Sequence, residues 1–172
     1  MAFAPHGSLN PQGAPVLKRE IITNSVASTV FQSLKLSSGF LALGTTGALV
    51  FGHLLAHTTE LGVGLNTTGA AGAAMGSYAN TYTVASDNQT VAKVKAECDV
   101  SKMSLYTVDP DATIGTTTGS DLSGYKADIA DQDNLDESTA ATTTLQYNLW
   151  GVDPNDSGNA IVNIFESQVF GV

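Results

Sequence analysis

The strongest constraint on the fold of this chain is an alternation of side-chain type between residues 91 and 98. Four small or apolar residues, Ala92, Val94, Ala96 and Cys98, take turns with Val91, Lys93, Lys95 and Glu97. A period of two is the geometry of a β-strand with one buried and one solvated face. The pattern therefore predicts a strand here, with Cys98 on the buried face.

Further short runs of strand type follow along the chain. Residues 103–108 and 125–129 are two of them. In a third, Leu145, Tyr147 and Leu149 alternate with Gln146, Asn148 and Trp150. The last predicted strand, 160–169, comes after 153–158, a run rich in turn-forming residues. Short strands between turn clusters predict an all-β fold, a β-sandwich or β-barrel of short antiparallel strands with long polar loops.

The segment after residue 16 is less decisive. Ile22, Val26, Val30 and Leu34 are four apart, a spacing that suits one face of a helix or of a strand. The segment is rich in β-branched residues, and its Ser and Thr compete with helical backbone bonds. We therefore predict strand.

Residues 1–15 differ in composition from the rest of the chain. They hold three of its five prolines, with Gly7 and Gly13 between them, which excludes a helix interior or a central strand. We expect an extended N-terminal arm, ordered by something outside the domain. Residues 16–172 then form one β-rich domain, with a possible internal boundary near 69–80, where an Ala/Gly run begins.

Charge is scarce over a long stretch of the chain. Between Lys35 and Asp87 the one charged side chain is Glu60, so this stretch is core or is covered by other protein. Within it, residues 37–56 are uncharged and nearly long enough to span a bilayer, but four glycines make them a poor membrane helix. A buried strand and tight turn is the better interpretation.

The acidic residues gather in one part of the chain. Twelve of the sixteen Asp and Glu lie within 97–156, against two lysines, and the net charge is −9. Such a balance argues against nucleic acid and against an anionic membrane as partners. The single cysteine, Cys98, excludes an internal disulfide framework and a Cys-rich zinc site.

Three segments contain residues of the types that bind metals. The acidic run 128–137 lacks the spacing of a calcium loop, and 153–158 matches its first half but has Ile164 at the position of the bidentate Glu. His53 and His57 are four apart, which suits two zinc ligands, but a third ligand is not visible nearby. A solvated loop, a plain turn and two structural histidines are the simpler interpretations, and calcium at either loop stays open.

The sequence contains no arrangement that indicates catalysis. A nucleophile elbow, a phosphate loop and a dinucleotide fingerprint are all missing, and Cys98 belongs to the apolar face of its strand. We therefore predict that the protein is not an enzyme, and we assign no catalytic, cofactor-binding or metal-binding residue and no cofactor.

The second half of the chain resembles a known family. The resemblance is carried by five ordered segments: residues 83–95, 114–125, 135–139, 149–155 and 162–168. Together they resemble the head decoration, or cement, proteins of tailed bacteriophages. The resemblance covers about half the chain and includes no catalytic signature.

The resemblance implies a non-enzymatic, β-rich structural protein on the outer surface of an icosahedral capsid. Such a protein would form a homotrimer, contact the major capsid protein and stabilise the shell by bridging its subunits. The arm could then lie along a neighbouring subunit through Phe3, Pro5, Leu9, Pro11 and Pro15. Much of residues 1–80 would be covered by other protein.

The alternative is a virion surface β-domain that binds host glycan. Aromatic rings can stack on sugars. The candidates are Tyr106, Tyr125, Tyr147 and Trp150.

Overall fold

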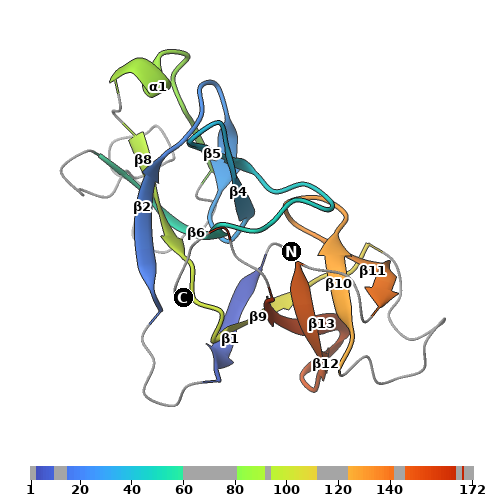
Figure 1. The fold of residues 1–172 in the computed structure, drawn as a ribbon. Helices are drawn as coiled ribbons and strands as arrows, with labels where there is room; N and C mark the ends of the chain where they lie inside the picture. Colours follow the sequence, from blue (N-terminus) through green and yellow to red (C-terminus); the bar gives the residue numbers. More distant parts are fainter. Residues whose placement is uncertain are drawn as a thin grey trace.

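The computed structural model describes residues 3–9, 15–59, 81–91, 94–111, 124–141, 146–165 and 168. It confirms the all-β prediction: the described residues form antiparallel strands and one four-residue helix, α1 (Asn88–Val91) (Figure 1). The strands are β1 (Ala4–Ser8), β2 (Leu17–Ile21), β3 (Ala27–Thr29), β4 (Ser33–Ser37), β5 (Phe40–Leu43), β6 (Gly52–Thr59), β7 (Thr81–Thr83), β8 (Val94–Asp99), β9 (Ser104–Val108), β10 (Lys126–Ile129), β11 (Leu135–Ala141), β12 (Tyr147–Asp153) and β13 (Asp156–Ile164).

Two sheets carry the fold. Sheet A has six strands in the order β1-β9-β13-β12-β10-β11, and sheet B has five in the order β2-β8-β6-β4-β5. A small pair, β3 and β7, forms a separate two-stranded sheet that packs against sheet B through Ser28 and Tyr82, both of which contact His57 of β6. Sheet B curls, because Ile22, just after β2, forms a bridge to Leu41 on β5 at the opposite edge. In Figure 1, sheet B lies at the upper left and sheet A at the lower right.

Each sheet has its own hydrophobic core. The core of sheet A contains Phe3, Tyr106, Tyr147 and nine other buried residues. The core of sheet B contains Leu41, Leu54, Cys98 and seven others. Both follow from the alternation, because successive residues of a strand point to opposite faces of the sheet.

The two sheets do not correspond to the two halves of the sequence. Strand β8 lies between β2 and β6 in sheet B, and β1, from the N-terminus, pairs with β9 in sheet A. Residues 16–59 therefore cannot complete their sheet without β8. The predicted internal boundary near 69–80 falls outside the described residues.

The N-terminal segment corrects one expectation. Residues 4–8 form an edge strand on β9, and Phe3 is completely buried. The arm residues 3–9 are thus ordered by the chain's own sheet, and burial of the apolar Phe3 ring stabilises that arrangement. Phe3 is therefore not free to contact a capsid subunit. Pro5, Leu9 and Pro15 are exposed, and Pro11 lies outside the described residues.

Most of the predicted strands are confirmed. Strands β8, β9, β10 and β12 lie within or largely within the predicted segments, and Val94, Ala96 and Cys98 are buried as the alternation required. The last strand overlaps the predicted segment at 160–164 but begins earlier, since β13 starts at Asp156 and the turn between β12 and β13 is correspondingly tighter. The segment after residue 16 is three short strands, with a turn at residues 24–25 and another at 30–31.

The described part of the long uncharged stretch contains core residues such as Leu41, Phe51 and Leu54, and exposed turns at 37–39 and 45–47; residues 60–80 lie outside the described residues. Residues 37–56 comprise the end of β4, strand β5, a turn and the first part of β6, as the buried-strand interpretation required. Within the described segments, no helix has the length and apolar character needed to cross a membrane.

The contact between β6 and β8 gives a first testable prediction. A Cβ atom on Gly52 would lie 2.5 Å from the carbonyl oxygen of Asp99, so no side chain fits there without moving a strand. We expect Gly52→Ala to lower the free energy of unfolding by about 2–3 kcal/mol, as overpacking does elsewhere. Urea denaturation measures this, and Gly7→Ala, where nothing lies within 4 Å, is the matched control. Equal stabilities of the two variants would contradict the prediction.

Candidate functional site

A bulge in β12 places Trp150 on the surface of sheet A. Leu149 pairs with Val162 and Gly151 with Ile161, so Trp150 is the extra residue on its strand. Gly151 has a φ of 132°, a backbone conformation that side chains other than hydrogen rarely allow. Bulges of this kind re-aim a side chain and often lie beside functional sites. Trp150 is 48% exposed.

The Trp150 ring is anchored although it is exposed. Its Nε1 donates to Oδ1 of Asn163, at 2.6 Å, and the Nδ2 of Asn148 donates to the same oxygen at 3.2 Å. Asn163 is itself buried, and its Nδ2 donates to the carbonyl of Lys102. One buried amide therefore fixes both the indole and a neighbouring polar side chain.

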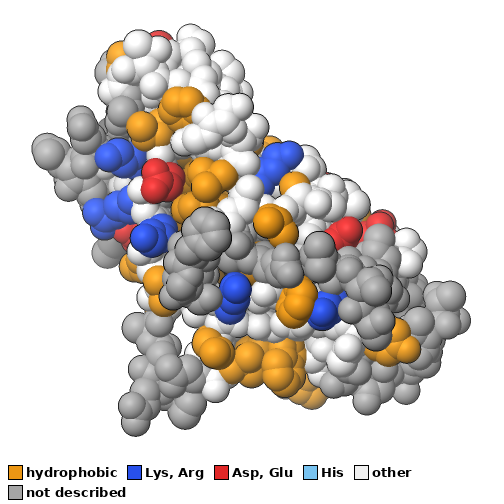
Figure 2. Space-filling view, viewed as in Figure 1, with side chains coloured by type: hydrophobic (Ala, Val, Ile, Leu, Met, Phe, Trp, Pro, Cys, Tyr) orange, Lys and Arg blue, Asp and Glu red, His pale blue; other side chains and the backbone are white. Residues whose placement is uncertain are grey.

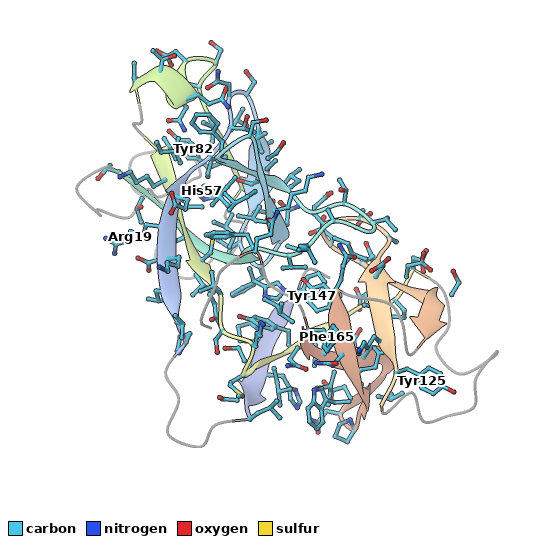
Figure 3. The ribbon with its side chains drawn as sticks, in the orientation of Figure 1. Arg19, His57, Tyr82, Tyr125, Tyr147 and Phe165 are labelled. Carbon is cyan, nitrogen blue, oxygen red and sulfur yellow. The ribbon has the colours of Figure 1, made fainter. Side chains whose placement is uncertain are left out.

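An open hollow of about 300 Å³ lies beside this ring. The residues that line it are Gly124, Tyr125, Asn148, Leu149 and Trp150. Tyr125 is 36% exposed and, in Figure 3, its side chain lies at the outer end of sheet A, away from Tyr147. We refer to this feature as the Trp150 hollow.

The structure divides the four predicted sugar-stacking residues into two pairs. Tyr125 and Trp150 are brought together at the hollow. Tyr106 and Tyr147 are wrong as ligand-binding candidates, because both are buried in the core of sheet A. Burial also raises the pKa of both phenols, which hydrogen-bond to Asp99 and to Ser33 respectively.

A second exposed feature is β2, at the edge of sheet B. Residues 15–20 are all exposed, including Val16 at 40% and Leu17 at 48%. Lys18 and Arg19 follow, and Arg19 pairs with Glu97 of β8 at 2.5 Å. Figure 2 shows Lys and Arg side chains gathered on the flank over β2, and Figure 3 shows Arg19 pointing outward there. An edge strand offers unpaired backbone groups to another strand.

The two histidines of the predicted zinc spacing do not converge on one site. His53 is completely buried, and its Nε2 hydrogen-bonds to the Tyr147 hydroxyl at 2.9 Å. His57 is also buried, and its Nε2 hydrogen-bonds to Ser28 at 2.8 Å. Burial lowers the pKa of His53 to about 3 and that of His57 to about 4. In the part of the chain that the structure describes, no group of three or more His, Cys, Asp or Glu could hold a metal ion.

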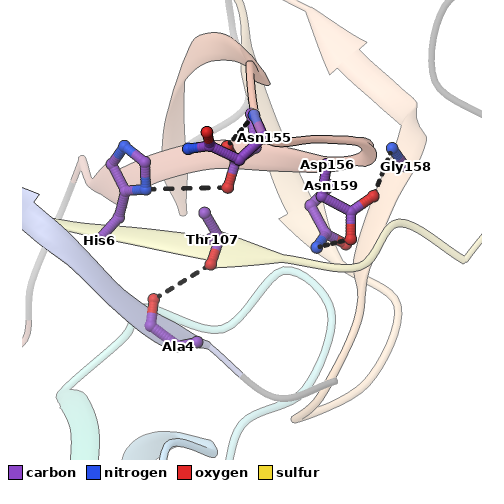
Figure 4. Close-up of polar contacts among 8 residues, drawn as sticks. Ala4, His6, Thr107, Asn155, Asp156, Gly158 and Asn159 are labelled. Carbon is purple, nitrogen blue, oxygen red and sulfur yellow. Dashed lines mark hydrogen bonds and ion pairs between the residues drawn. The ribbon is translucent and has the colours of Figure 1, made fainter.

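The turn between β12 and β13 uses its carboxylates in local hydrogen bonds (Figure 4). Asp153 Oδ1 accepts from the backbone N of Asn155 at 2.8 Å, and Asp156 accepts from the backbone N of Gly158 and from Asn159. His6 of β1 lies 3.8 Å from the other oxygen of Asp153. These contacts are those of a plain turn, in which Asp side chains bond the backbone two residues on.

The acidic run 128–137 forms the β10–β11 hairpin. Asp131 accepts from the backbone N of Asp133 and of Asn134, and Asp136 accepts from Ser138. Burial and the neighbouring charge of Asp136 raise the pKa of Asp128. Asp131 and Asp136 therefore serve the hairpin and its turn.

Cys98 lies in the core of sheet B. It is completely buried, and burial, followed by the charges of Glu97, Asp99 and Glu20, raises the pKa of its thiol. A thiol in this setting is packing rather than a nucleophile.

The comparisons with known proteins add no relative. Neither protein-family models, nor curated proteins, nor solved structures include a match to this chain.

One sequence signal indicates the hollow in retrospect. A glycine inside a strand pattern is typical of a bulge, and Gly151 follows Trp150 in a segment whose alternation had already put Trp150 on the polar face. No local signal indicates that Tyr125 lies beside it, because the two meet through the pairing of β10 with β12.

Proposed function

We propose that the protein is a structural virion protein that decorates the outer surface of an icosahedral phage capsid. In this role it stabilises the shell by bridging major capsid protein subunits, as a homotrimer and without enzymatic activity. The resemblance of residues 83–168 to head decoration proteins supports the proposal. The all-β architecture agrees with what that resemblance implies.

The observation that carries the proposal is the exposed edge strand β2. Val16 and Leu17 present apolar surface beside Lys18 and Arg19, in a protein whose net charge is −9. Charged side chains such as Lys18 and Arg19 protect an edge strand from pairing with copies of itself, and they leave it open to a partner strand of complementary charge. We assign the capsid contact to β2, in place of an arm that would include Phe3.

The distribution of charge is consistent with this orientation. The exposed Asp131 and Asp156 belong to turns of sheet A, whereas the cations Lys18, Arg19 and Lys95 of β2 and β8 are balanced by Glu20, Glu97 and Asp99 of the same strands. With β2 against the shell, the turns of sheet A that carry Asp131 and Asp156 would face solvent, where negative charge keeps decorated particles apart by repulsion.

Binding to undecorated capsids tests the proposal. We expect the purified protein to occupy capsids assembled from the phage's own major capsid protein and to raise the temperature at which they break open. Leu17→Glu should weaken this binding at least about tenfold, since it puts a charge into a desolvated contact. Leu17 is half exposed, so the variant should melt at the wild-type temperature.

The matched control is Met103→Glu, which places the same charge on an apolar side chain that is 53% exposed, in the turn before β9. It should bind capsids as the wild type does. A protein that ignores undecorated capsids would contradict the proposed function. Wild-type binding by Leu17→Glu would instead show that the contact lies elsewhere than β2.

A further inference from the structure

The Trp150 hollow shows features of a binding site that capsid contact through β2 does not require. Trp150 is the chain's one tryptophan, and nearly half of its side-chain surface is in solvent. Exposing so much aromatic surface forgoes the stabilisation that burial would bring, about 25 cal/mol for each Å². The bulge at Trp150 and the left-handed Gly151 nevertheless put it there.

The ring is also held in one orientation before any ligand arrives. The bond from its Nε1 to Asn163 fixes the indole, and Asn163 is fixed in turn by its bond to the Lys102 carbonyl. A ligand that stacks on a fixed ring does not have to order that side chain on binding, and this improves affinity. The anchor therefore indicates preorganisation.

The chemistry of the lining indicates the class of ligand. Trp150 and Tyr125 supply aromatic surface, and the Asn148 amide supplies a polar group at the same hollow. A pyranose ring matches this combination, because its C–H face packs on an aromatic ring while its hydroxyls hydrogen-bond to an amide. The volume of about 300 Å³ lies at the lower end of the range for small-molecule sites and suits one or two sugar units.

The charge of the protein narrows the class further. A net charge of −9 repels anionic sugars such as those with carboxylate or sulfate groups. It also disfavours nucleotides, whose bases could stack on the same rings but whose phosphates require basic partners.

We propose that the Trp150 hollow binds a neutral pyranose sugar, stacked on Trp150 and beside Tyr125 and hydrogen-bonded by Asn148. This site is separate from β2, so the protein could contact a capsid and a carbohydrate at the same time.

Tryptophan fluorescence of the intact protein reports directly on this site, since Trp150 is the sole tryptophan. We expect titration with neutral oligosaccharides of glucose, galactose, mannose or N-acetylglucosamine to shift the emission to shorter wavelength for at least one of them. Isothermal titration with that sugar should give a saturable curve. Sialylated and sulfated oligosaccharides should give no shift.

Variants of the residues that line the Trp150 hollow test whether the sugar binds by stacking on the aromatic rings. Trp150→Ala should weaken binding of that sugar at least about tenfold in calorimetry, as removal of a central aromatic does in other sites. Trp150→Phe should retain most of the affinity, and Tyr125→Ala should lose several-fold. Met103→Ala, which truncates an exposed apolar residue that does not line the hollow, should bind as the wild type does.

Three outcomes would overturn the proposal. They are no saturable binding of any neutral sugar at millimolar concentration, binding that survives Trp150→Ala, and binding confined to anionic polymers. Circular dichroism and the melting temperature of Trp150→Ala establish that a loss of binding is not unfolding. Because these measurements use the protein without capsids, their result is independent of the capsid-binding test.

Discussion

Replacing Phe3 with alanine is expected to lower the free energy of unfolding by about 3–5 kcal/mol, the range for a phenylalanine truncated in a core. The Phe3 ring is completely buried and lies 4.7 Å from the ring of His53 and 4.9 Å from that of Tyr147. Its backbone N also donates to the carbonyl of Phe31, which ties the chain end to the loop before β4. The variant leaves a cavity where the two sheets meet.

Urea denaturation of the two proteins measures the effect. Leu9→Ala is the control within the same segment, because Leu9 is 37% exposed and should change the free energy by less than about 0.5 kcal/mol. If Phe3→Ala were as stable as Leu9→Ala, the result would contradict the burial of the Phe3 ring in the core of sheet A. The result also affects how a deletion of residues 1–15 is interpreted. Such a deletion would remove Phe3 and β1 and so expose the core of sheet A, and it would remove any capsid contact of these residues at the same time.

Individual strands and their buried faces could be predicted from the sequence, but which strands pair with one another could not. The alternation at 94–98 fixed both the strand and its buried face, because each strand's period of two is visible in its own residues. That β8 lies between β2 and β6 depends on contacts with residues about 40 and 80 positions away. Nothing in the alternation of β8 specifies its neighbours.

The burial of Phe3 also could not be predicted from local sequence patterns. The prolines and glycines of residues 1–15 correctly exclude a central strand, and β1 is an edge strand. Composition predicts an extended arm, but it does not show that the Phe3 ring packs against the rings of His53 and Tyr147. A single buried residue has no periodicity to reveal it.

The candidate site was partly predictable. Alternation had placed Tyr147 on the buried face of its strand and Trp150 on the polar face, and the structure agrees. Gln146 breaks this rule, since it is buried. Its amide donates to the carbonyls of Thr45 and Ala48 and accepts from the backbone N of Ile129. A buried polar residue needs such partners, and here two of the three lie about 100 positions away.

The second large effect is expected on acidification, which should lower the free energy of unfolding by about 4 kcal/mol between pH 7 and pH 5. Burial lowers the pKa of His53 to about 3 and of His57 to about 4, whereas both titrate near 6.5 in an unfolded chain. Below pH 6.5 the two histidines of the unfolded chain therefore bind protons, whereas those of the folded protein do not. Each histidine contributes about 2 kcal/mol at pH 5.

The surroundings of both rings are consistent with this sign. The Nδ1 atoms of His53 and His57 are buried and have no hydrogen-bond partner among the described residues, so a proton there would be poorly solvated. His53 faces Phe3, Tyr106 and Tyr147, and it pairs across the strands with Asp99. The Asp99 carboxylate, which would favour a charged His53, already accepts a hydrogen bond from the Tyr106 hydroxyl.

Carboxyl groups do not mask the effect in this pH range. Aspartate and glutamate in unstructured peptides titrate at about pH 4, below this range, and the raised pKa of Asp128 acts in the opposite sense, because it makes the folded protein bind a proton more readily. Above pH 6.5 the histidines do not make the free energy of unfolding depend on pH. The stability they govern is complete there and is lost as the pH falls from 6.5 towards the folded pKa values of about 4 and 3.

Two variants assign the loss to its source. In His57→Gln the amide can keep the hydrogen bond to Ser28 without titrating, so the loss between pH 7 and pH 5 should fall to about 2 kcal/mol. Leu9→Ala, at an exposed residue of the N-terminal segment that carries no titratable group, should leave the loss at about 4 kcal/mol. Urea denaturation at both pH values measures all three proteins. An unchanged loss in His57→Gln would show that His57 is protonated in the folded protein at pH 5, and that its burial does not govern acid stability.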